Sequence, residues 1–183
     1  MNKQNLISEP TYTSISHMSA KVHIDIVDDT LDLSDLELRN LPALPPGLKR
    51  LICRNNQLTT LPDLPDELLE LDCKNNNLTI LPSLPSHLAK LDCSKNNLHE
   101  LPALPENLVI LYCNANKLRA LPEIPHSLIS LFCGRNQIQR LPTIPSSLHT
   151  LHCMENPIKN ASEIPKTLQN LYIDETKRQC TIM

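Results

Sequence analysis

Aromatic residues and glycine are scarce in this chain of 183 residues, which has three tyrosines, one phenylalanine, no tryptophan and two glycines. A compact globular domain normally draws much of its buried mass from large aromatic side chains. This shortage excludes an aromatic-rich core, so the chain must bury aliphatic side chains instead. Leucine, repeated many times along the sequence, is the residue available for thin apolar layers.

Further absences narrow the classes of function. The formal net charge of −3 argues against nucleic acid as a partner, and no apolar run is long enough to span a bilayer. Residues 1–30 lack the apolar core and small-residue cleavage site of a secretory signal peptide. The sequence also has no H-E-x-x-H motif and no glycine-rich phosphate loop. We therefore expect no catalytic residues, no metal site and no cofactor.

What the sequence does contain is a repeat of twenty residues, which its leucines reveal first. They recur at Leu51, Leu71, Leu91, Leu111, Leu131, Leu151 and Leu171. A cysteine column follows at Cys53, Cys73, Cys93, Cys113, Cys133 and Cys153. An asparagine column follows at Asn56, Asn76, Asn96, Asn116, Asn136 and Asn156. One unit reads L-x-C-x-x-N-x-L-x-x-L-P-x-L-P-x-x-L-x-x, and a degenerate copy begins at Leu31.

Each column has a physical role. Leu51 and Cys53 alternate with polar residues, which is the period of a half-buried strand, and identical strands stack as a parallel sheet. The asparagine amide both donates and accepts, so it can satisfy backbone groups in a buried turn. The paired prolines suit a polyproline-like path that has no backbone ladder. The predicted fold is a leucine-rich-repeat solenoid, of the α/β class by convention but built mostly of short parallel β-strands with an extended convex side.

The same pattern divides the chain into four segments. Residues 1–20 are polar, and we expect a disordered leader there. Residues 21–30 alternate apolar and polar side chains, and we expect an N-terminal capping strand. Residues 31–173 hold about seven repeats, and residues 174–183 form a C-terminal tail. Because one repeat cannot bury its own apolar edge, the array is expected to depend on contacts between neighbouring repeats.

The double-proline unit, for example from Leu61 to Leu78, resembles the repeats of the bacterial effector leucine-rich-repeat family of the YopM and IpaH type. The resemblance covers about residues 31–173. It implies a protein that is injected into host cells and binds a host protein there, with residues 1–20 as a candidate export signal. The IpaH-type members carry a catalytic ligase domain after their repeats. Since only residues 174–183 follow the repeats here, ligase activity is not carried over.

The cysteine column has two interpretations. Six aligned thiols could form a metal or redox ladder, or they could be small buried apolar side chains. The spacing lacks the C-x-x-C pairs typical of zinc sites, so we favour the structural role. Free thiols in this number indicate a reducing compartment such as a cytosol.

A seventh cysteine lies outside the column, in the last four residues, Cys180, Thr181, Ile182 and Met183. This is the pattern of a C-a-a-X prenylation box, and a terminal methionine favours a farnesyl group. A host prenyltransferase would attach the lipid to Cys180, and the farnesyl group would bring the protein to a host membrane at its cytoplasmic face. The alternative is an accidental cysteine near the end of the chain.

Solenoids bind partners with the outward strand positions, which we call the concave face. The position between the strand leucine and the cysteine reads Ile52, Asp72, Asp92, Tyr112, Phe132, His152 and Tyr172. Three of the four aromatic residues fall in this column, and interfaces are rich in aromatic side chains. The predicted partner-binding residues are Ile110, Tyr112, Phe132, His152, Met154 and Tyr172. Two alternatives stay open, namely cover by the C-terminal tail and cross-strand stacking that only stabilises the sheet.

These observations support one leading hypothesis for the function. It is a non-enzymatic scaffold, injected into a host cell, prenylated at Cys180, located at a host membrane or in the host cytosol, and bound to a host protein. The main alternative is a soluble binding module without lipid that acts in its own cytosol. A third hypothesis, a ligase that uses Cys180 as its catalytic thiol, has little support from the fold or the sequence.

Overall fold

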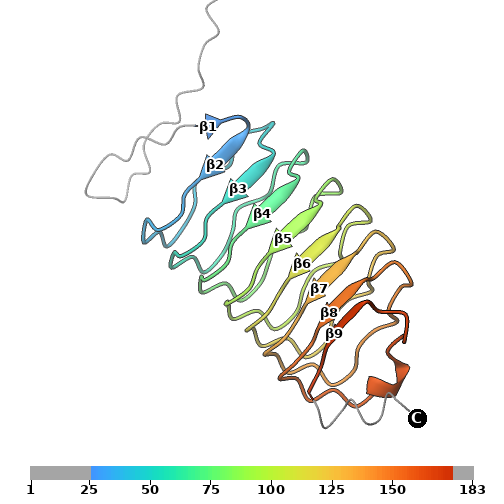
Figure 1. Ribbon diagram of the computed structural model, residues 1–183. Coiled ribbons are helices and arrows are strands. Elements are labelled where there is room, and N and C mark those ends of the chain that lie inside the picture. Colours follow the sequence, from blue (N-terminus) through green and yellow to red (C-terminus); the bar gives the residue numbers. More distant parts are fainter. Residues whose placement is uncertain (1–25, 175–183) are drawn as a thin grey trace, which may run out of the picture.

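A nine-stranded sheet runs along one side of the molecule in the order β1 to β9. The computed structural model describes residues 26–174 (Figure 1). The strands are β1 (Ile26–Val27), β2 (Thr30–Asp32), β3 (Arg50–Ile52), β4 (Glu70–Asp72), β5 (Lys90–Asp92), β6 (Ile110–Tyr112), β7 (Ser130–Phe132), β8 (Thr150–His152) and β9 (Asn170–Tyr172). β1 pairs antiparallel with β2, and every later neighbour pairs in parallel. The predicted leucine-rich-repeat solenoid is confirmed.

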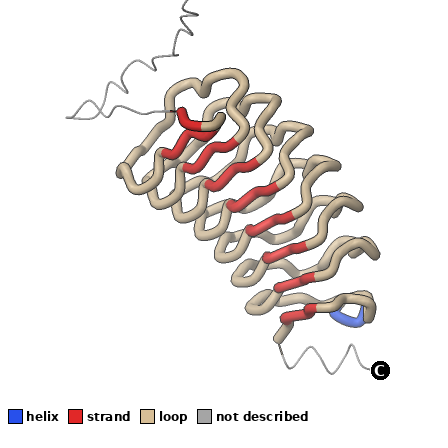
Figure 2. Tube along the Cα trace, turned by 45° about the horizontal axis from the view of Figure 1, so that its top comes forward, coloured by secondary structure: helices blue, strands red, loops and turns tan. Residues whose placement is uncertain are grey.

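Loops and turns connect the strands around the opposite side of the array (Figure 2). Among residues 26–174 the sole helical segment is the 3-10 helix η1 (Ala161–Glu163), which stands where earlier repeats have Leu-Pro. The prediction of an extended convex side with almost no helix is therefore confirmed. Within the same residues, no helix has the length and apolar character that crossing a bilayer would require.

The core consists of the repeated apolar columns packed layer on layer. The strand leucines from Leu51 to Leu151 and the cysteines from Cys53 to Cys153 are completely buried. Parallel pairing puts each leucine directly beside its equivalent, as with Leu91 and Leu111. Fully burying one such side chain contributes about 1.5–3 kcal/mol, so stability accumulates from one layer to the next.

The asparagine column forms a second ladder, made of hydrogen bonds. Asn96 Oδ1 accepts from the Leu78 amide at 3.0 Å. Its Nδ2 donates to the Cys73 carbonyl at 3.0 Å and to the Cys93 carbonyl at 3.1 Å. Each asparagine thus ties its own repeat to the preceding one, and it satisfies backbone groups that are buried from water. The predicted role of the amide is confirmed.

A feature that the sequence analysis did not predict accompanies each asparagine. The residue just before it has a positive φ, between 54° and 57°. These residues are Asn55, Asn75, Lys95, Ala115, Arg135 and Glu155. The left-handed conformation turns the chain sharply away from the sheet, and asparagine tolerates it better than most residues. The turn lets the next residue place its amide beneath the sheet.

Several predicted segments lie outside the described residues. These are the polar leader 1–20, the first half of the capping segment 21–30, and the terminal box Cys180, Thr181, Ile182 and Met183. Within the described part, β1 and β2 form an antiparallel pair at the N-terminal end of the array, with Ile26 opposite Leu31. The parallel order of the sheet therefore begins at β2.

Candidate partner-binding site on the concave face

Four rings stand side by side across the last four strands. Parallel pairing places Tyr112, Phe132, His152 and Tyr172 in direct register on β6 to β9. The ring centroids of Tyr112 and Phe132 are 4.7 Å apart, those of Phe132 and His152 6.2 Å, and those of His152 and Tyr172 5.5 Å. We call these four residues the ring ladder. Its spacing follows that of neighbouring strands, about 4.8 Å.

Stacking changes what the ring ladder offers to a partner. Tyr112, Phe132 and His152 are each half-buried, because their faces cover one another, whereas Tyr172 at the end is 47% exposed. Aromatic side chains in this column were predicted to be exposed, and only Tyr172 is exposed. Cross-strand stacking, one of the two alternatives left open, is present in the structure. The remaining accessible surface of the inner rings is their outward edge.

The other predicted partner-binding residues flank the ring ladder. Ile110 begins β6 and is half-buried, and Met154 follows β8 and is 37% exposed. Val109 and Ile129, just before β6 and β7, add further exposed apolar surface. The structure therefore gathers the six predicted residues on one face, in the C-terminal half of the array.

Gly134 makes room for one of the rings. A Cβ at this position would lie 2.9 Å from His152 Nδ1 and 3.0 Å from Cε1 of the same ring, which is closer than real contacts allow. The His152 ring therefore lies directly against the glycine, and Nδ1 is buried without a hydrogen-bond partner among the described residues. A hollow of about 190 Å³ is lined by Phe132, Gly134 and His152, with Asn114, Arg135 and Glu155 at its margin.

The N-terminal half of the concave face is charged. Lys90 Nζ lies 2.6 Å from Glu70 Oε1, and Arg54 lies 4.0 Å from Asp72. Desolvation by burial is the main cause that raises the pKa of Asp72, helped by the nearby charge of Asp92 and opposed by the hydrogen bond from the Lys74 amide. Two carboxylates in adjacent rungs are thus held among basic side chains.

A second hollow, of about 460 Å³, opens where the charged half meets Tyr112. Its charged lining consists of Asp72, Lys74, Lys90, Asp92, Lys95 and Arg135. We call it the basic hollow, and the one beside Gly134 the glycine hollow. Neither was predicted from the sequence, because a hollow depends on which side chains pair with each other. The only sequence signal was a glycine in the strand-end column where other repeats carry side chains.

The buried cysteines show no sign of a reactive site. Burial is the first cause that raises the pKa of the Cys53 thiol, to about 12, and that raises the pKa values of Cys73, Cys93, Cys113 and Cys133 well above the ordinary thiol range. A thiol held protonated is neither a good nucleophile nor a good metal ligand. The column therefore packs as small apolar side chains, the interpretation favoured from the sequence.

The histidines near the ring ladder do not converge on a site. His149 is exposed, and its Nδ1 lies 2.7 Å from the Ser147 carbonyl oxygen. Cys153 is fully buried, on the other side of the sheet from the concave face. Within residues 26–174, no group of three or more histidine, cysteine or acidic side chains is arranged to hold a metal ion.

Solved structures of bacterial effector repeats are similar to this array. YopM from Yersinia enterocolitica WA-314 matches with a TM-score of 0.77 and 38% identity, over 79% of this chain and 32% of that chain. YopM from Yersinia pestis, described as a leucine-rich effector protein, matches with a TM-score of 0.67 and 32% identity, over 80% of this chain and 49% of that one. A Shigella effector leucine-rich-repeat domain matches with a TM-score of 0.65 and 29% identity, over 81% and 82%.

The likeness to these structures supports the expected family of bacterial effector leucine-rich repeats. The chain spans about a third of the length of the first YopM structure and about half of the second. No protein-family profile and no curated protein matches the sequence. The fold is thus that of an effector-like leucine-rich-repeat scaffold.

Proposed function

We propose that the protein is a bacterial effector that acts in a host cell by binding a host protein with its concave face. The observation that carries the proposal is the ring ladder. Four aligned rings present their edges along one face, flanked by the exposed Met154. Aromatic side chains in a row contribute rigid contact area at low conformational cost, which is why binding surfaces are rich in them.

Binding, rather than catalysis, is the role that the described residues support. Several charged side chains of the concave face are engaged in ion pairs, such as Lys90 with Glu70 and Arg135 with Glu155. The buried thiols have raised pKa values, which keeps them protonated and unreactive. A nucleophile next to a base would be needed for covalent catalysis, and a scaffold needs neither.

The similar solved structures support the effector part of the proposal, because two of them are described as effector proteins.

Binding of a host protein by the concave face is tested by proximity labelling in host cells that express the full chain. Phe132→Ala combined with Tyr172→Ala should lose the labelled partner while the fold is retained. Ile80→Ala is the matched control, since it removes an apolar side chain that is 56% exposed but lies outside the concave face. Equal labelling by the ring variant would overturn the concave face as the binding surface.

Lipidation of Cys180 is the second part of the proposal and rests on the sequence of the terminal box. The enzyme requires a free carboxylate after the box, so the proposal holds for a chain whose last residue is Met183. A clickable farnesyl donor in host-cell extract should label the wild-type chain and not Cys180→Ser. Intact mass of the protein from host cells then reports both the lipid and the terminal trimming.

A single farnesyl chain gives weak and reversible membrane attachment. We therefore expect the lipidated protein to divide between the cytoplasmic face of a host membrane and the host cytosol. Label that is absent from wild type, or equal in Cys180→Ser, would remove the lipid from the proposal and leave an unlipidated binding module. The binding test and the lipid test are independent of each other.

A further inference from the structure

The two hollows of the concave face adjoin each other, and together they mark a path along it. Asn114 and Arg135 line both the basic hollow and the glycine hollow. The path runs along the carboxyl ends of the strands, from β4 to β8. It therefore crosses the strands, and a chain segment lying in it would meet the basic hollow at one end and the glycine hollow at the other.

The basic hollow has an excess of positive charge. Of its basic residues, Lys90 is paired with Glu70 and Arg135 with Glu155. Lys74 and Lys95 form no ion pair with any residue between 26 and 174. Of the two opposing carboxylates, Asp72 lies 4.0 Å from Arg54, and Asp92 Oδ1 accepts from the Ser94 amide, a contact that leaves the charge of Asp92 in place. The lining still holds four basic side chains against these two carboxylates. An acidic group on a partner would complement the two remaining ammonium groups.

The glycine hollow fits a chemically different group from the one that the basic hollow fits. Its walls are the Phe132 and His152 rings and the bare backbone of Gly134. Its only ion pair, Arg135 with Glu155, is already closed at 2.8 Å. Burying apolar surface against these rings is favourable, whereas a charge would lose its water without gaining a free partner. The hollow therefore fits one apolar side chain.

The distance between the hollows sets the spacing of the two groups. The basic hollow is lined mainly by residues of β4 to β6 and the turns after them, and the glycine hollow mainly by those of β7 and β8, with Asn114 and Arg135 shared between them. Their centres are two to three strands apart, roughly 10–14 Å at about 4.8 Å per strand. An extended chain covers this with three or four residues, at about 3.4 Å per residue.

We propose that the partner presents an extended segment that crosses the strands, with an acidic side chain in the basic hollow and an apolar side chain in the glycine hollow. The two side chains are three or four residues apart in the segment. This inference rests on the proposed binding function and specifies the chemistry of the partner. Each hollow accepts a different kind of side chain. The two hollows together therefore favour segments that carry both side chains at this spacing over segments that are merely hydrophobic.

Selection of random phage-displayed peptides on the full chain tests the proposal. Enriched peptides should contain Asp or Glu three or four residues from a large apolar side chain. For a labelled peptide of this type, fluorescence anisotropy should show binding at least about ten-fold weaker in Lys74→Glu with Lys95→Glu. High salt should weaken binding by the wild type and have little effect on that variant.

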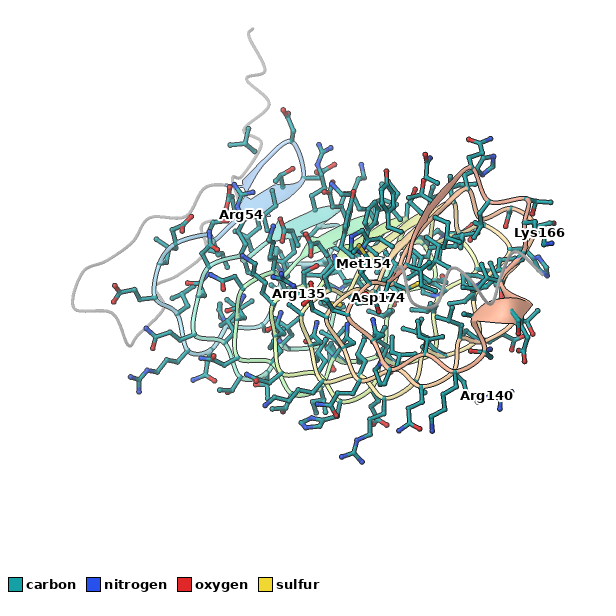
Figure 3. The ribbon with its side chains drawn as sticks, turned by 60° about the horizontal axis from the view of Figure 1, so that its bottom comes forward. Arg54, Arg135, Arg140, Met154, Lys166 and Asp174 are labelled. Atoms are coloured by element: carbon teal, nitrogen blue, oxygen red, sulfur yellow. The ribbon has the colours of Figure 1, made fainter. Side chains whose placement is uncertain are left out.

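Two further variants complete the design. Gly134→Ala places a methyl group against the His152 ring, which must shift. Since that ring lines the glycine hollow, the variant should weaken peptide binding without changing any charge. Lys166→Glu is a charge-reversal control at a distant site, since Lys166 is exposed near the end of the array, away from Arg135 and Met154 (Figure 3), and it should leave affinity unchanged. Circular dichroism checks each fold, and Lys74→Gln with Lys95→Gln replaces the charge reversal if that variant unfolds.

Several outcomes would overturn the inference. One is that no peptide is enriched, and another is that the enriched peptides lack the spaced acidic and apolar pair. A third is a peptide that binds equally to wild type, to the lysine variants and to Gly134→Ala. If such a peptide still depends on Phe132 and Tyr172, the proposed concave-face function stands and only the inferred motif falls. If binding of the peptide does not depend on the ring ladder either, both the concave-face function and the inferred motif are wrong.

Discussion

The rings of Tyr112 and Phe132 lie 4.7 Å apart between centroids and are tilted by only 19°, on residues that are direct partners in β6 and β7. This close stacking gives the pair two consequences that experiments can separate. It stabilises the sheet by contacts between neighbouring strands, and it holds the ring edges rigid for a partner. A side chain that does both is expected to affect stability and binding by different amounts.

A double-mutant cycle measures the first consequence. Tyr112→Ala, Phe132→Ala and the combined variant should show a coupling free energy of about 0.5–1.5 kcal/mol in urea unfolding, the range found for aromatic pairs. Tyr112 with Tyr172, which are not neighbours in the ring ladder, is the control cycle and should couple by less than about 0.5 kcal/mol. Equal coupling in both cycles would contradict a specific stacking contact.

Asn96 provides a second prediction. Its side-chain amide accepts a hydrogen bond from one backbone N–H group and donates to several backbone carbonyls, among them those of Cys73 and Cys93. The residue is buried. Asn96→Ala leaves these groups without partners, so it should lower the free energy of unfolding by about 2–4 kcal/mol. Asn97→Ala is the neighbouring control and should have a small effect. A small loss for Asn96→Ala would mean that water replaces the amide.

The buried thiols predict a loss of stability at alkaline pH. Above the ordinary thiol pKa of 9.0 the unfolded chain releases protons, whereas in the folded chain burial keeps the pKa of Cys53 at about 12 and that of Cys93 higher than usual. The folded state then binds more protons, so stability falls as pH rises, by about 1.4 kcal/mol per pH unit for each thiol.

Urea midpoints measured between pH 8 and 11 check this slope. Above pH 9, where the unfolded thiol loses its proton, Cys93→Ala should make the slope shallower, approaching about 1.4 kcal/mol per pH unit, whatever the change costs at neutral pH. Ser94→Ala alters a neighbouring buried residue that has no thiol and should keep the wild-type slope. The same thiols should react with Ellman's reagent only after denaturant is added.

The left-handed column offers a stabilising substitution. Ala115 has a φ of 54°, and the equivalent residues Asn55 and Asn75 have the same conformation and are joined by a side-chain hydrogen bond of 3.0 Å. Because asparagine tolerates this conformation better than alanine, Ala115→Asn should raise the free energy of unfolding by about 0.5–1 kcal/mol. Ala89→Asn, at a position without positive φ, should give no such gain.

Much of this architecture follows from periodicity. The alternation of Leu91 and Cys93 predicts a buried strand face, and a column of identical asparagines predicts a repeated polar contact, and both are present. These features recur in each repeat, so each copy of the sequence gives the same evidence for a buried strand face and for a polar contact in the turn. The outward position of Phe132 also follows directly, because side chains alternate along a strand.

The features that vary between repeats were harder to predict. The fit of His152 against Gly134 depends on one missing Cβ, and the basic hollow depends on which lysines are already paired. The left-handed turn before Asn116 was also missed, since Ala115 gives no sign of it. A one-dimensional pattern shows which side of the sheet a residue faces, but not which neighbouring side chain it contacts.

The hydrogen bonds of each asparagine reach only its own repeat and the one before it, as those of Asn96 do. An in-frame gain or loss of one twenty-residue unit would therefore preserve every junction that remains. A unit gained or lost between the two hollows would shift the glycine hollow relative to the basic hollow by one strand spacing. Such a change would alter the spacing between the acidic and the apolar side chain that a bound segment must have, while leaving the buried layers intact.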